Sequence, residues 1–266
     1  EKACPTDCID FTMEDEEFNL HVSTVILATG FTLFDPLKMP RYGFGEYKNV
    51  LTSMQMERQI APTRPFHTIL RPSDGKVPDK IAYVLCTGSR DVSVGNPICS
   101  QICCMYSIKQ AQLLMGALPM ADITIYYLNI RSFGKGFEEF YEQAKGMGVN
   151  FIKGKIGKIS EKENGNLLLR YEDINAGKLK LAEHDMVVLS VGSLPNMEAS
   201  GMFSDELKLD QFNFVGQPDM MASPAQTSIE GVFVAGTASA PMDIPDTILS
   251  AGSASSEAIS YLMKKG

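Results

Sequence analysis

The sequence has no long apolar run, so no segment suits a passage across a bilayer. Its longest apolar stretches, such as Met186–Val191, are far shorter than the roughly 20 residues that a membrane-spanning helix needs. It also has no basic amino-terminal stretch followed by an apolar segment, and therefore no visible signal peptide. We expect a cytoplasmic chain without a direct membrane span, which partner subunits could hold at the inner face of the membrane.

Basic residues are fewer than acidic ones. The chain carries 24 Lys and Arg against 32 Asp and Glu, a formal net charge of −8. Non-specific nucleic-acid binding depends on basic side chains that neutralise phosphates, so we predict no nucleic-acid partner. The three histidines, His21, His67 and His184, show no ligand spacing with the cysteines, and we predict no functional role for them.

The glycine fingerprint of dinucleotide-binding folds, G-x-G-x-x-G, is missing as well. Residues 43–45 and 134–136 have two glycines each, but lack the third and the strand-to-helix setting. A nicotinamide fingerprint should follow the apolar run that ends at Leu85, and a cysteine-bearing loop stands there instead. We infer that a cysteine site replaces a nicotinamide site.

The composition of the 266 residues is that of a folded protein, with 44% hydrophobic and 21% charged residues. Buried-strand patterns alternate with helical patterns from residue 80 onward, which predicts a parallel sheet covered by helices. We expect strands at residues 18–22, 24–28, 81–85, 123–128, 149–152, 185–190 and 231–236. A small antiparallel meander is expected at residues 156–160, 167–171 and 178–181. Helices are expected at residues 53–59, 99–115, 137–145 and 246–263.

Four of the six cysteines, Cys86, Cys99, Cys103 and Cys104, gather on one loop and one helix start. The first follows a predicted strand at the carboxyl end of the sheet, where parallel α/β folds bind ligands. A helix amino terminus stabilises thiolates, and a cluster several ångströms wide collects such a set more easily than one small ion. We predict an iron–sulfur cluster. Structural zinc, buried structural cysteines and a two-thiol redox centre remain the alternatives.

The amino-terminal run also carries a cysteine signal. Cys4-Pro5 resembles the end of a bacterial ferredoxin module, in which the last cluster ligand precedes proline. We predict Cys4 as a ligand of a second cluster, and assign no ligand role to Cys8. The chain begins at Glu1 without an initiator Met, so we expect a piece of a longer polypeptide whose other ligands lie upstream.

Two predicted strands end in glycine in the manner of flavoproteins. Residues 25–30, ending Ala28-Thr29-Gly30, match the ATG segment of two-dinucleotide-binding-domain flavoproteins, and residues 231–236 match their second FAD segment. Glycine there lets the backbone approach a cofactor closely. Asp normally follows the last glycine, whereas this chain has Thr237. Each match alone is weak, and the pair flanking a β–α–β domain is moderately specific.

Residues 86–91, 99–111, 133–141 and 243–246 closely resemble the A subunit of heterodisulfide reductase. Flavoprotein subunits of the quinone-interacting oxidoreductase complex of sulfate reducers are similar. The resemblance implies a thioredoxin-reductase-like α/β core with an inserted ferredoxin module, FAD and several [4Fe-4S] clusters, in anaerobic electron transfer between partner subunits. It assigns one [4Fe-4S] cluster to Cys86, Cys99, Cys103 and Cys104. It places near FAD the residues Ala28, Thr29, Gly30, Gly236, Thr237, Asp246, Thr247 and Ile248.

The resemblance also implies how the chain divides and works. We expect a ferredoxin-module tail at residues 1–12, part of an FAD domain and a connection at 13–79, a nicotinamide-domain-like unit with the cysteine site at 80–192, and the rest of the FAD domain at 193–266. The expected function is an oxidoreductase subunit that relays electrons through FAD and [4Fe-4S] clusters, with no catalytic residue assigned, and we expect the isolated fragment to be inactive. Alternatives are an NAD(P)H-dependent disulfide reductase using Cys103-Cys104 and a non-catalytic docking domain. A homodimer is a further option.

Overall fold

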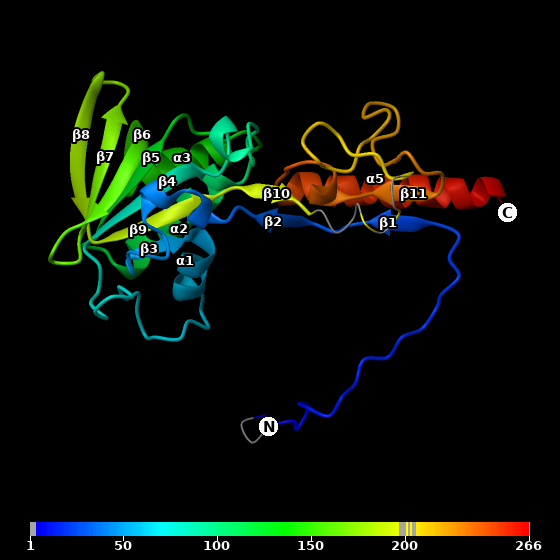
Figure 1. Cartoon of the computed structure of the whole chain (residues 1–266), viewed down its shortest axis with the longest axis horizontal. Coiled ribbons are helices and arrows are strands. Elements are labelled where there is room, and N and C mark those ends of the chain that lie inside the picture. The colour runs from blue at the N-terminus through cyan, green and yellow to red at the C-terminus, as the bar shows by residue number, and fades with distance from the viewer. Residues whose placement is uncertain (1–3, 197–200, 202, 204–205, 266) are drawn as a thin grey trace.

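The computed structural model describes residues 4–196, 201, 203 and 206–265. They form a larger body around one sheet, a smaller body beside a long carboxyl-terminal helix, and an extended amino-terminal segment that leads away from both (Figure 1). No helix among these residues combines the length and the apolar character that a membrane crossing requires.

Seven of the described strands form the sheet of the larger body, in the order β3-β9-β4-β5-β6-β7-β8. The strands are β3 (Val50–Thr52), β4 (Lys80–Thr87), β5 (Asp122–Tyr127), β6 (Asn150–Glu161), β7 (Leu167–Asp173), β8 (Lys178–His184) and β9 (Met186–Val191). Pairing is parallel from β3 to β6 and antiparallel from β6 to β8. The mixed α/β class expected from the sequence is therefore confirmed.

Each face of this sheet packs against its own core. On one face lie α1 (Ser53–Ile60), α2 (Cys103–Ala117) and α3 (Phe137–Gly146). On the other lie Met39, which follows the 3-10 turn η1 (Pro36–Lys38), and Tyr42 of the 3-10 turn η2 (Pro40–Tyr42). The central strand β4 is apolar on both faces because both are covered. Thr52 and Gln55 start α1 with a reciprocal capping box.

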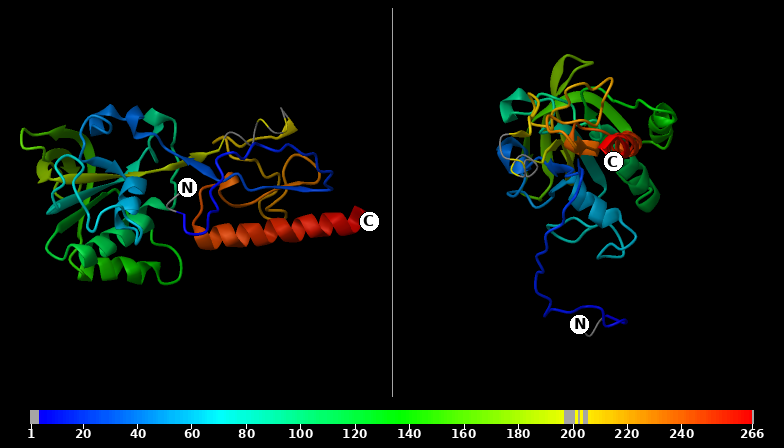
Figure 2. Two further views of the ribbon diagram at one scale, coloured as in Figure 1. Left: turned by 90° about the horizontal axis from the view of Figure 1, so that it is seen from below. Right: turned by 90° about the vertical axis from the view of Figure 1, so that its right-hand side faces the viewer.

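The smaller body is built on two short ribbons. Strand β1 (Val25–Leu27) pairs in parallel with β11 (Val232–Val234), and β2 (Phe31–Leu33) pairs antiparallel with β10 (Ser193–Pro195). The β2–β10 ribbon leads from one body to the other (Figure 1). Figure 2 shows the last helix, α5 (Ile244–Lys265), running along one side of this body, which it contacts through Ala254 and Ala258.

Several predicted elements differ from the structure. The helix expected from residue 99 begins only at Cys103, because Gln101 has a φ of 61°, which no α-helix accommodates. The strands expected at 149–152 and 156–160 are two parts of the single strand β6, which continues through a register shift. Residues 18–22 form no strand, and the side chains of Phe18, Leu20 and Val22 are exposed. The division of the chain at residues 12, 79 and 192 stays a prediction.

Candidate functional site

Cys86 lies at the carboxyl end of β4, where the strand departs from regular geometry. Its φ is 57°, and the pairing of β4 with β9 shifts register between Val84 and Thr87. A left-handed backbone at a residue with a side chain is unfavourable and persists only where the surroundings hold it. The distortion turns the end of the strand into a loop that carries a half-buried thiol.

The loop from residue 88 to residue 100, which contains the short turn η3 (Val92–Val94), is held by buried hydrogen bonds. The Asn96 amide donates to the Gly88 carbonyl at 2.8 Å, and the hydroxyls of Ser89 and Ser100 lie 2.7 Å apart. The Arg90 N–H donates to the Ile98 carbonyl at 2.9 Å. These contacts fold the loop back, so that the residues on either side of it return to one place.

Cys99, Cys103 and Cys104 follow where this loop meets α2. The Gln101 N–H donates to the Cys99 sulfur at 3.3 Å. Cys103 and Cys104 begin the helix, and their thiols donate to the carbonyls of Val191 (3.7 Å) and Asn129 (3.9 Å). Cys99 therefore lies ahead of the helix, whereas Cys103 and Cys104 lie in its first turn.

The four thiols lie within electrostatic reach of one another. Burial raises the pKa of Cys103 most, and negative charge on Cys86, Cys104 and Cys99 would raise it further. Burial also raises the pKa of Cys104 to about 11, although a hydrogen bond from the Arg131 backbone opposes it. The same desolvation raises the pKa of Cys86, against a lowering by the Arg90 guanidinium. The site thus has two buried thiols, Cys103 and Cys104, and two half-buried ones, Cys86 and Cys99, with arginine beside them.

The donors that this site offers are all sulfur atoms. Among the described residues, no three His, Cys, Asp or Glu side chains are close enough to enclose one metal ion. The converging side chains are all thiols, the donors that iron–sulfur clusters use. A cluster held by Cys86, Cys99, Cys103 and Cys104 stays a prediction.

Cys4 lies apart from these four residues, on the extended amino-terminal segment (Figure 1). Its sulfur lies 3.4 Å from that of Cys8. Hydrogen bonds, the largest from the Thr6 hydroxyl, lower the pKa of Cys4 to about 6. A ligand role for Cys4 stays a prediction.

The two flavin-type strand ends lie side by side, as β1 and β11 pair in register. The hydroxyl oxygen of Thr29 is buried and forms no hydrogen bond, and a Cβ on Gly30 would meet no atom within 4 Å. An unpartnered hydroxyl beside open space is what a bound polar cofactor would complete. Ala28, Thr29 and Gly30 therefore fit a dinucleotide such as FAD.

The second strand end meets the start of α5. A Cβ on Gly236 would lie 3.1 Å from the Thr247 methyl, and the Gly236 N–H donates to Ser250 at 2.9 Å. Thr237 follows within the 3-10 turn η5 (Gly236–Ala238). The helix begins at Ile244, two residues before its expected start. Asp246, Thr247 and Ile248 thus lie within its first five residues. The Asp246 N–H donates to the Asp243 carboxylate at 2.9 Å.

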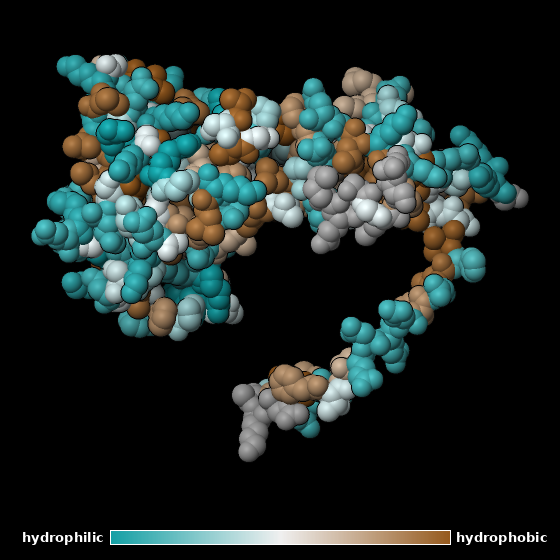
Figure 3. Space-filling model, in the orientation of Figure 1, coloured by the Kyte–Doolittle hydropathy of each residue, from teal (hydrophilic) through white to brown (hydrophobic). Residues whose placement is uncertain are grey.

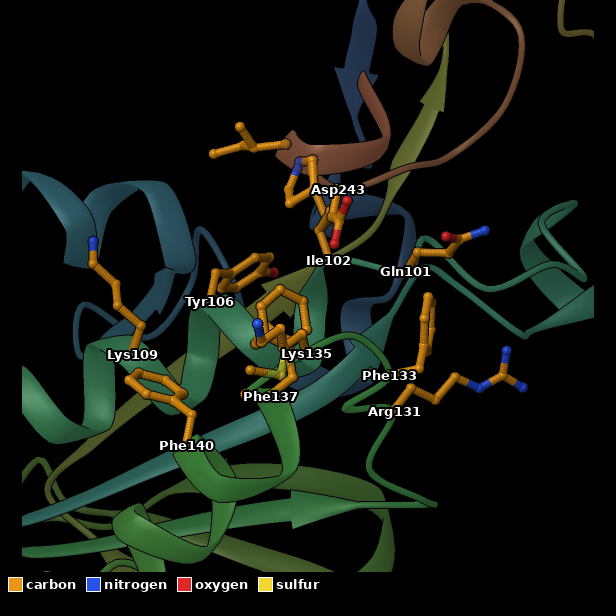
Figure 4. A pocket seen from close by; sticks show the side chains of 14 residues that line it. Gln101, Ile102, Tyr106, Lys109, Arg131, Phe133, Lys135, Phe137, Phe140 and Asp243 are labelled. Atoms are coloured by element: carbon orange, nitrogen blue, oxygen red, sulfur yellow. The ribbon is translucent and has the colours of Figure 1, made fainter. Parts of the chain in front are cut away.

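A cavity of about 600 Å³ lies between α2, α3 and the start of α5. Figure 4 shows Arg131 and Phe133 on one side of it, Lys109 and Phe140 on the other, and Asp243 at the α5 end. The sequence alone did not predict this cavity. Its only signal was the aromatic and basic composition of residues 131–140, which does not reveal that α5 lies opposite.

No family model matches the chain. It is 42% identical over 273 aligned positions to the iron-sulfur A subunit of the CoB–CoM heterodisulfide reductase of Methanocaldococcus jannaschii, covering 100% of this chain and 41% of that protein. It is 37% identical over 268 positions to the A subunit of the H(2):CoB-CoM heterodisulfide,ferredoxin reductase of Methanothermobacter thermautotrophicus, covering 99% and 40%. The chain therefore spans about two fifths of the length of these relatives.

Solved structures with the same fold include two thioredoxin reductases. That of T. acidophilum has a TM-score of 0.55 at 16% identity, over 92% of this chain and 67% of that one. That of Lactococcus lactis has a TM-score of 0.55 at 15% identity, over 91% and 66%. At these identities the likeness shows the fold, which is the thioredoxin-reductase-like fold expected from the sequence.

Proposed function

Because the chain belongs to the family of heterodisulfide reductase A subunits, of whose curated members it spans about two fifths, we propose that it is an electron-transfer part of an oxidoreductase. In this proposal it relays electrons between partner subunits through FAD and a [4Fe-4S] cluster. The ligands of the cluster are Cys86, Cys99, Cys103 and Cys104.

The observation that carries the proposal is the convergence of four thiols behind a folded-back loop. Burial raises the pKa of three of them, so they release protons readily only when a bound metal compensates. A cluster bound there would take up single electrons and would need no hydride donor. The cysteine loop also occupies the position at which a related reductase would carry its nicotinamide-binding loop.

The flavin would lie between the two bodies. Thr29 offers a buried hydroxyl without a hydrogen-bond partner, and Gly30 has free space where a Cβ would lie. The first turn of α5 offers helix N–H groups to electron-rich atoms. The neighbouring cavity of about 600 Å³ is large and apolar enough for an aromatic ring system. FAD, when bound, would accept electrons in pairs and pass them on one at a time. The chain's part is to hold that ring close to the buried cysteines.

The described site gives less support to a disulfide reductase that uses Cys103 and Cys104 as its redox pair. Both side chains are buried, whereas a dithiol that reduces an external disulfide needs access for its attacking thiolate. That alternative predicts nicotinamide binding. A pure docking domain predicts that the cysteines bind nothing.

Anaerobic purification followed by iron and sulfide analysis and electron paramagnetic resonance tests the proposal. We expect iron and acid-labile sulfide in equal amounts, and a cluster signal that disappears in Cys99→Ser. Cys8→Ser is the matched control and should keep this signal, because Cys8 lies on the amino-terminal segment (Figure 1). Stoichiometric zinc without iron, or unchanged iron in Cys99→Ser, contradicts the assignment.

A further inference from the structure

Tyr106 on α2 contacts the same backbone carbonyl as the buried thiol of Cys103. The Tyr106 hydroxyl donates to the Val191 oxygen at 2.9 Å, and the Cys103 thiol donates to the same oxygen at 3.7 Å. Two donors that share one acceptor atom lie next to each other. Burial raises the pKa of Cys103, and a hydrogen bond between the phenol and the sulfur opposes that rise. Tyr106 thus places a hydroxyl at the sulfur of a proposed cluster ligand.

A second hydrogen bond orients the Tyr106 hydroxyl. Ser53, at the start of α1, is buried and donates to the phenol oxygen at 3.2 Å. A phenol oxygen that accepts from Ser53 must direct its own hydrogen elsewhere, and the Val191 carbonyl and the Cys103 sulfur lie beside it. The hydroxyl hydrogen can therefore turn from the carbonyl to the sulfur while the ring stays in place.

A free cysteine and a ligated one differ in what they offer to Tyr106. The free Cys103 thiol has a hydrogen, which it donates to Val191. A cysteine that binds iron is a thiolate, so it has no hydrogen and can only accept hydrogen bonds. Binding of a cluster therefore ends the bond from Cys103 to Val191 and leaves the sulfur beside one donor, the Tyr106 hydroxyl. Hydrogen bonds to the sulfurs are among the factors that set the reduction potential of a cluster.

The ring of Tyr106 also lines the cavity of about 600 Å³ between α2, α3 and the start of α5 (Figure 4). The outer surface of the larger body is largely polar in the view of Figure 3, but Ile102, Met105 and Phe137 line this cavity together with Tyr106. A hydrogen bond in apolar surroundings is stronger than one for which water competes. One side chain thus reaches from the proposed place of the flavin ring to the proposed cluster.

We propose that Tyr106 is a positioning residue whose hydroxyl donates to the Cys103 thiolate when a cluster is bound, and that this bond raises the reduction potential of the cluster. The inference rests on the proposed function, because it requires iron at these cysteines. Reduction adds one electron, taken from reduced flavin in the proposed function, and makes the four-thiolate unit more negative. The bond from Tyr106 becomes stronger as that charge grows. Tyr106 keeps its proton, so no covalent bond forms or breaks.

Tyr106→Phe tests this role, because it keeps the ring and removes the hydroxyl. We expect iron and acid-labile sulfide to stay at the level of the unaltered chain. The ratio of reduced to oxidised cluster at a fixed potential should fall about tenfold, which equals about 59 mV for one electron. Titration with dithionite followed by electron paramagnetic resonance measures the shift. Ser53→Ala removes the donor to the phenol oxygen and should lower the potential by less. In deuterated buffer, pulsed resonance should detect a deuteron near the cluster that Tyr106→Phe lacks.

Tyr83→Phe is the matched control. The Tyr83 hydroxyl is also buried in the larger body but has no hydrogen-bond partner among the described residues, so its removal should leave the potential unchanged. Three results would each overturn the role of Tyr106 alone: an unshifted potential in Tyr106→Phe at full iron content, loss of iron from that variant, or an equal shift in Tyr83→Phe. Absence of iron from the unaltered chain would instead refute the proposed function, and the role of Tyr106 with it.

Discussion

At the scale of single residues, the cysteine site combines two opposing electrostatic requirements. Burial raises the pKa of Cys86, Cys103 and Cys104, which disfavours thiolates. Arg90 acts in the other direction, as its guanidinium lowers the pKa of Cys86 and of Cys104. A group with four thiolate ligands carries net negative charge that increases on reduction, so this arginine should favour the reduced state.

Arg90→Gln should therefore lower the reduction potential of the cluster. Loss of one nearby positive charge disfavours the more negative reduced form, and a shift of about 60 mV corresponds to roughly 1.4 kcal/mol for a one-electron couple. Redox titration followed by electron paramagnetic resonance measures the shift. Arg64→Gln makes the same change at a guanidinium that contacts the His67 carbonyl, and it should leave the potential where it was. An unshifted potential in Arg90→Gln at full iron content would refute this role.

The sequence showed which cysteines to consider, because residue type and spacing are readable directly. It did not show that Arg90 and Arg131 act on them. That depends on a loop whose left-handed residues Cys86, Arg90 and Gln101 have no sequence signature. Nor could the sequence show that the hydroxyl of Thr29 is buried without a partner.

At the scale of elements, the loop after β4 decides whether the thiols converge. Gly88 has a φ of 72°, and a Cβ there would lie 2.0 Å from the Phe34 ring. Its carbonyl also accepts the hydrogen bond from Asn96 that folds the loop back. Glycine is thus required at this position for both conformation and space.

Gly88→Ala should destabilise the chain and reduce iron incorporation. Gly95→Ala provides a control with a φ of 78° and no atom within 4 Å of the added Cβ. In both variants an alanine must adopt a left-handed backbone conformation, which lowers the free energy of unfolding by roughly 1 kcal/mol. Only Gly88→Ala adds a clash, which overpacking data put at roughly 1–3 kcal/mol. Denaturant unfolding and iron analysis measure the two effects, and equal stabilities of the two variants would contradict the steric argument.

The sequence predicted the type of each helix and strand better than the residues at which it begins and ends. The apolar run of residues 81–85 and the turn-bounded meander strand at 167–171 predicted strands that the structure confirms as β4 and β7. The helix at the cysteines was extended too far toward the amino terminus, since the left-handed backbone of Gln101 breaks it and periodicity does not record backbone conformation. The pattern of Phe18, Leu20 and Val22 suited a strand, but no strand among the described residues pairs with it.

At the scale of the whole molecule, the described residues form separate cores. The seven-stranded sheet has one on each face, and the β1–β11 ribbon and α5 have smaller ones of their own. The cysteine site belongs to the larger body, whereas Thr29, Gly30 and Gly236 belong to the smaller. The β2–β10 ribbon links the two bodies, and the cavity beside α5 lies between the two regions proposed to hold the cofactors. Electron exchange between cofactors would thus depend on how the bodies are held, and cluster binding would not.

This arrangement predicts that the two bodies unfold separately. Val234→Ala removes two methyl groups from a fully buried position in the smaller body, and Val188→Ala makes the same change in the sheet. Each should cost roughly 1–3 kcal/mol, but only to its own body. Calorimetry should show two transitions, with Val234→Ala lowering one while iron content stays intact, and Val188→Ala lowering the other. A single transition that both variants lower equally would mean that the cores fold as one unit. The folding of the cysteine site would then depend on the stability of the smaller body.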